Sequence, residues 1–69
     1  MAEYLIVIEG TDRSFSAYVP DLPGCVAAGG SVEEVERLIR QAIKLHIENL
    51  RAHGEPVPGP QSTARSVPI

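Results

Sequence analysis

The acidic side chains of this sequence are numerous enough to support metal-dependent hydrolysis. Such chemistry needs several carboxylates that converge on two divalent cations. Some of the acids lie in segments expected to turn the chain and the others lie on an expected helix, so none interrupts a core strand. We therefore interpret them as solvated loop or helix-capping residues. They are Glu9, Asp12 and Asp21 in the turns and Glu33, Glu34, Glu36 and Glu48 on the helix.

Cys25 is a second candidate for chemistry, because a thiolate can act as a nucleophile. It would need a histidine base, and His46, on the apolar side of the expected helix, could approach the sheet. We favour a small buried cysteine and a half-buried histidine, placed in the core or at a subunit interface. Cys25, His46 and His53 do not match a zinc-ligand spacing, and a lone cysteine excludes an internal disulfide. The sequence therefore predicts no catalytic residue, no metal and no cofactor.

Composition narrows the class of protein. The chain has 69 residues, with six basic and nine acidic side chains and a formal net charge of −3. The basic side chains are scattered along the sequence and form no continuous basic surface, so we expect no nucleic-acid binding. Without a signal sequence or an apolar run near the roughly 20 residues of a membrane span, we expect a cytoplasmic protein and no membrane contact.

The chain is so short that its fold is expected to need further stabilisation, which a second copy of the chain can supply. A chain this short buries only about 60% of the surface that its unfolded form exposes, which leaves its stability marginal. Small domains often add a disulfide, a metal or another subunit. Because the sequence offers neither of the first two, we expect a homodimer or a higher even oligomer.

Three segments with strand-like patterns precede a long amphipathic segment. The first is a continuous apolar and β-branched run, the second alternates apolar with polar residues, and the third consists of small residues. A polar turn makes an antiparallel hairpin of the first two, and two prolines with a glycine turn the chain before the third. The strands are expected at residues 4–8, 14–19 and 25–28, and the turns at residues 9–13 and 20–24.

A capping box opens the expected helix, with Ser31 at the N-cap and Glu34 three residues later. The helix should run from Val32 to about His53 and end at Gly54. Its apolar arc is about 200° wide, which is more than one small sheet requires. One flank is expected to cover the sheet and the other a second subunit. We assign the oligomer interface to Ile43, Leu45, Ile47 and Leu50.

These elements predict an α+β fold, a small antiparallel sheet with one long helix packed on one face. The domain is expected to span residues 1–60. Residues 61–69 form a C-terminal tail that can make at most a short edge strand, since Pro68 suits an edge position.

The order of these motifs resembles the HicB-like antitoxin family of type II toxin–antitoxin systems, over about residues 3–60. Gly30 and Ser31 stand where the family often has an acidic residue and a threonine, although the cap survives. The resemblance implies a degenerate ribonuclease H-like fold of the order β-β-β-α-β, here in a short form that lacks the DNA-binding domain of many members. It rests on the Pro-Asp-Leu-Pro-Gly-Cys run at residues 20–25, the Gly-Gly-Ser helix start at residues 29–31, Glu34, and Gly54 followed by prolines.

The resemblance also implies a function. This chain would bind and neutralise a small basic HicA-like toxin that cleaves messenger RNA, and it would not be an enzyme. We assign partner contact to Asp12, Asp21 and Leu22, with the two acids projecting from one end of the hairpin; Asp21 could also close its own turn. Two alternatives stay open, an orphan homodimeric α/β domain with another protein partner and a remnant ribonuclease H-like hydrolase.

Overall fold

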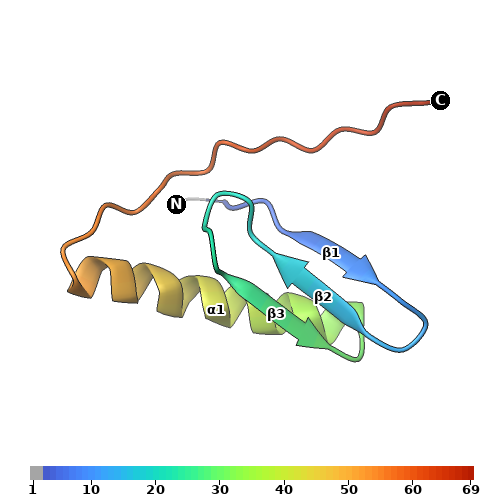
Figure 1. Ribbon diagram of the computed structural model, residues 1–69, viewed down its shortest axis with the longest axis horizontal. Helices are drawn as coiled ribbons and strands as arrows, with labels where there is room; N and C mark the ends of the chain where they lie inside the picture. Colours follow the sequence, from blue (N-terminus) through green and yellow to red (C-terminus); the bar gives the residue numbers. More distant parts are fainter. Residues whose placement is uncertain (1–2) are drawn as a thin grey trace.

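The chain forms a three-stranded antiparallel meander with one long helix against one face (Figure 1). This computed structural model describes residues 3–69. The elements follow the order β1 (Val7–Gly10), β2 (Phe15–Tyr18), β3 (Val26–Gly29) and α1 (Val32–Ala52). β2 is the central strand, so β1 and β3 are both edge strands. The predicted α+β class, with an antiparallel sheet and one helix, is confirmed.

The core lies between the sheet and α1. In β2, Ala17 is 2% exposed, whereas its neighbours Ser16 and Tyr18 are exposed. This is the alternation expected of a strand with one face packed and one face in solvent. Residues from the loop after β2 and from α1 complete the packing. The buried side chains are Ala17, Val19, Leu22, Cys25, Val35 and Ile39.

The loop between β2 and β3 folds inward around Leu22. The backbone N–H of Leu22 donates to the Val19 carbonyl at 3.1 Å, and the N–H of Cys25 donates to the Leu22 carbonyl at 3.1 Å. Gly24 has a φ of 84°, a left-handed conformation that residues with a Cβ rarely adopt. These turns leave the Leu22 side chain 0% exposed. The proline–glycine run therefore builds the core as well as reversing the chain.

Side-chain caps define the ends of α1. Ser31 Oγ accepts the backbone N–H of Glu34 at 3.1 Å, which confirms the predicted N-cap. Glu34 Oε1 accepts the N–H of Gly30 at 3.0 Å, one residue before the position that a capping box uses. At the other end, Gly54 adopts a φ of 68°, as expected of a glycine that ends a helix.

The structure differs from the expected strands at both ends of the chain. β1 begins at Val7 because Val7 already lies opposite Tyr18, the last residue of β2, so residues 4–6 have no β2 residue beside them. Residues 55–69 form neither helix nor strand, so the expected short edge strand in the tail is not present. Every residue from 61 to 69 is exposed. No burial offsets the conformational entropy that ordering these residues as a strand would cost.

Candidate protein-binding surfaces

The negative charge of the chain is concentrated at one end of the molecule. The β1–β2 turn and the start of α1 both lie at this end, because Gly10 lies opposite Phe15 and Phe15 lies opposite Gly29, which leads into the helix. We call residues 9–14 and 32–38 the acidic end. Five acids and two bases give it a net charge of −3, while four acids and four bases leave the rest of the chain neutral. Its charged residues are Glu9, Asp12, Arg13, Glu33, Glu34, Glu36 and Arg37.

The residues assigned to partner contact from sequence do not form one surface. Asp12 is exposed in the β1–β2 turn, within the acidic end. Asp21 lies in the β2–β3 loop, at the opposite end of β2 (Figure 1), because successive turns of an antiparallel meander alternate between its ends. Leu22 is fully buried, because the turns of its loop direct the side chain into the core. The prediction that Leu22 contacts a partner is therefore wrong.

Asp21 ties the C-terminal tail to the β2–β3 loop. Its Oδ2 accepts the backbone N–H groups of Gln61 at 3.0 Å and Ser62 at 3.1 Å, and its Oδ1 accepts the Ser62 hydroxyl at 2.9 Å. The Gln61 and Ser62 donors lower the pKa of the Asp21 carboxyl below its ordinary value of 3.8. Nearby, the Tyr4 hydroxyl donates to the Pro58 carbonyl. The carboxylate of Asp21 therefore holds the C-terminal tail to the β2–β3 loop, and we call these hydrogen bonds the tether.

We expect this tether to break only in acid. Because its hydrogen bonds lower the folded-state pKa of Asp21, its stabilisation is complete above pH 3.8 and is lost as the pH falls through the lower folded-state pKa. In an NMR titration, the amide shifts of Gln61 and Ser62 should follow one transition with a midpoint below pH 3.8. Asp21→Ala should abolish that transition and speed amide exchange in the tail at neutral pH. A midpoint at or above pH 3.8 would contradict the tether.

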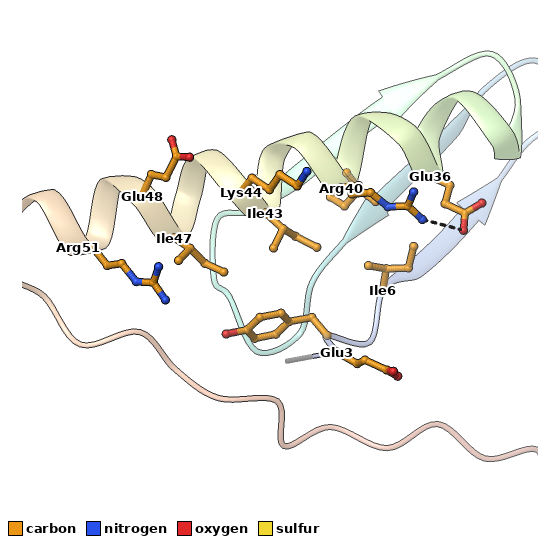
Figure 2. Close-up of a pocket in the computed structure, with 11 residues that line it drawn as sticks. Glu3, Ile6, Glu36, Arg40, Ile43, Lys44, Ile47, Glu48 and Arg51 are labelled. Carbon is orange, nitrogen blue, oxygen red and sulfur yellow. Dashed lines mark ion pairs between the residues drawn. The ribbon is translucent and has the colours of Figure 1, made fainter. Parts of the chain in front are cut away.

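The two flanks of α1 face different surroundings. Ile43 and Ile47 pack against the core of their own chain. They also line an open groove of about 750 Å³, whose other side is formed by the N-terminal segment with Glu3 and Ile6 (Figure 2). Leu45 lies outside that groove and is 65% exposed, whereas Leu50 is half-buried. The residues assigned to one oligomer interface therefore divide between two sides of the helix.

Charged side chains of both signs rim the groove between α1 and the N-terminal segment. One pair is joined, with Arg40 Nη2 3.9 Å from Glu36 Oε1 (Figure 2). Both side chains are more than half exposed, so this ion pair contributes little to stability. Opposite charges balance along the rim, and the groove does not select a ligand of either sign. The charged lining residues are Glu3, Glu36, Arg40, Lys44, Glu48 and Arg51.

Cys25 and His46 border one shallow hollow beside the start of β3. Cys25 is 3% exposed, and its burial raises the pKa of the thiol, which disfavours the reactive thiolate. Within residues 3–69, the structure brings no three histidine, cysteine, aspartate or glutamate side chains together as a candidate metal site. No helix in that range combines the length and the apolar character needed to cross a membrane.

Sequence reasoning missed the partners of Asp21 and the full extent of the acidic end. Gln61 and Ser62 lie 40 and 41 residues from Asp21, and no local pattern signals a contact at that separation. The acids at the start of the helix were visible as capping residues. These acids lie at the same end of the molecule as Asp12 only because strand pairing places the β1–β2 turn and the helix start at one end of the sheet.

The fold defines a class, a small α+β domain with a three-stranded antiparallel sheet and one long helix on one face. Residues 4–67 match the family described as HicB-like antitoxin of bacterial toxin–antitoxin system, and the chain belongs to this family. A chain in a solved structure of a HicA3 and HicB3 toxin–antitoxin complex is similar in fold and sequence. The match has a TM-score of 0.73 and 35% identity, and it covers 86% of this chain and 70% of that chain.

Curated relatives come from distant organisms. A UPF0150 protein of Helicobacter pylori is 46% identical over 46 residues, which cover 67% of this chain and 64% of that protein. A UPF0150 protein of Thermoplasma acidophilum is 35% identical over 54 residues, 78% of each chain. A 14.9 kDa protein from the rep–hol intergenic region of Haemophilus phage HP1 is 36% identical over 55 residues. The chain spans less than two thirds of the Helicobacter protein and 41% of the phage protein.

Proposed function

We propose that this chain is an antitoxin that neutralises a small, basic, HicA-like toxin by binding it directly. The observation that carries the proposal is the match, at 35% identity, to a chain of a toxin–antitoxin complex over most of both chains. Membership of the HicB-like antitoxin family supports the same role. Inhibition by binding requires no catalysis and no cofactor from this chain. The two proteins would meet in the cytoplasm, where messenger RNA is cleaved.

The acidic end supplies a physical basis for neutralisation. A protein that cleaves RNA has to hold phosphate groups, and it does so with basic side chains. The net charge of −3 at the acidic end attracts such a surface and raises the rate of encounter more than the final affinity. Once docked, its carboxylates would occupy the basic groups that otherwise hold RNA. Neutralisation is then competition for one charged surface of the toxin.

Co-expression tests the proposal. A HicA-like toxin from the same genome should arrest growth when expressed alone, and this chain should restore growth and co-purify with the toxin. Leu22→Asp is the control, because an unpaired charge at this fully buried position should prevent folding and so remove both rescue and binding. Continued arrest beside well-folded wild-type protein, with no complex recovered, would refute the antitoxin role.

A further inference from the structure

We propose that the outer edge of β3 and the adjoining flank of α1 bind a second copy of this chain in a two-fold dimer. Within residues 3–69, β3 pairs with β2 on one side only, so its other side is open to a further strand. The N–H of Val19 donates to the Cys25 carbonyl at 3.2 Å. Because successive residues of an antiparallel strand direct their backbone groups to opposite sides, Val26 and Ala28 then point theirs outward. The edge thus presents unpaired donors and acceptors.

The β3 edge is short, with four residues, but it carries no charge, no proline and no bulge. Natural edge strands carry charges, prolines or bulges that deter a second chain. β3 has the sequence Val-Ala-Ala-Gly, and Val26 is 64% exposed. The opposite edge is different, because β1 contains the exposed Glu9, and Tyr4 just before it contacts the tail at Pro58. Of the two edges, β3 is the one suited to pairing.

The flank of α1 beside β3 continues this uncharged surface. Leu45 is 65% exposed and faces Gly24 and Val26 across a hollow of about 380 Å³. Helix residues three or four positions apart share one side. One such row runs through Leu45 and carries no charge, while Glu48, three positions after Leu45, lies beside this row. The charged residues of the helix lie at other positions. The members of this flank are Leu38, Ala42, Leu45 and Asn49.

A second copy of the chain is the occupant that these features favour. An edge that pairs antiparallel with itself is self-complementary, as a two-fold interface must be. A two-fold axis near Ala27 would set Val26 opposite Ala28 of the second copy, and each such pair would exchange both backbone hydrogen bonds. The sheets would join with both helices on one face. The antiparallel arrangement sends the two acidic ends in opposite directions, which limits their repulsion and leaves both free.

Side-chain size also fits this arrangement. On the side of β3 that faces the helix layer, Ala27 and Gly29 are small, and Ala27 lies opposite the buried Ala17. Two such strands can lie side by side while Leu45 of each copy packs over the seam. Burial of Leu45 would then stabilise a chain whose own core is small.

The oligomeric state tests the dimer without any toxin. In light scattering at high micromolar concentration, the wild-type chain should have twice the 7.4 kDa mass of a monomer. Leu45→Glu should halve that mass, because it places two carboxylates at the seam. Val32→Glu is the matched control, because it makes the same charge change at another exposed apolar residue of the helix. Val32 is 41% exposed, and this variant should stay dimeric. A monomeric wild-type chain would overturn the proposal.

Ala28→Pro provides a second variant that acts through the backbone. It removes an N–H that points away from β2, so the sheet of one chain should survive while pairing to the second copy is lost. If folded Leu45→Glu and Ala28→Pro proteins both keep the wild-type dimer mass, the dimer uses another surface and the proposal is wrong. Hydrogen exchange of the wild-type protein tests the same interface without any substitution. The amides of Val26 and Ala28 should become protected as concentration rises, and no change there would overturn the proposal.

Discussion

Replacement of Leu22 by alanine is expected to lower the free energy of unfolding by about 2–5 kcal/mol. Leu22 is 0% exposed and belongs to the cluster that joins the β2–β3 loop, the sheet and the helix. At 0.05–0.15 kcal/mol per residue, a chain of this length has a total stability of roughly 3–10 kcal/mol. The substitution should therefore remove a large share of the total stability of the fold. Urea unfolding followed by circular dichroism, at one fixed protein concentration, measures the loss.

Val32→Ala is the matched control for this experiment. It also removes apolar atoms, but from a side chain that is 41% exposed, so its effect should stay within about 0.5 kcal/mol. An equally small effect of Leu22→Ala would mean that the loop does not belong to the core. A large difference between the two would place the Pro-Asp-Leu-Pro-Gly-Cys run at residues 20–25 among the elements that hold the fold together.

Reversal of Glu9 and Asp12 to lysine should slow association with the proposed toxin by about 10- to 100-fold at low salt. Both residues are exposed, so the fold should tolerate the change. The double substitution adds four positive units and takes the acidic end from a net charge of −3 to +1. Stopped-flow mixing measures the association rate. The deficit should shrink as salt is added, because screening shortens the range of the attraction.

Glu48→Lys combined with Glu55→Lys is the control for total charge. It adds the same four units outside the acidic end and should slow association much less than the Glu9 and Asp12 pair. Equal slowing by both pairs would show that the total charge steers the encounter. No slowing by the first pair would show that the acidic end does not face the toxin, while the co-expression experiment still decides the antitoxin role.

Local sequence patterns were sufficient to identify the elements and their order. The alternation around Ala17 predicted the packed face of β2, because side chains of a strand point to its two faces in turn. Ser31 with Glu34 predicted the start of α1, and Gly54 its end, since capping acts within a few residues. The motif at residues 20–25 led to the correct family. All these signals depend on residues that lie close together in the sequence.

Strand ends and surfaces depended on the tertiary structure. The run that begins at Tyr4 has the composition of a strand, yet β1 starts at Val7 because β2 ends opposite it. Likewise, the apolar arc of α1 was recognisable from spacing. Only the packing of the helix against the sheet decides that Ile43 packs against the core on one flank while Leu45 is exposed on the other.

The three strands, the capped helix and the family of this chain could be predicted from the sequence, because each depends on residue types at short spacing, and the excess of acid follows from composition. Only the tertiary structure decided that Leu22 points into the core, that Asp21 holds Ser62, and that the acids gather at one end. Asp21 and Ser62 are 41 residues apart. Such contacts follow from how strand pairing and helix packing bring distant segments together, and no local periodicity encodes that geometry.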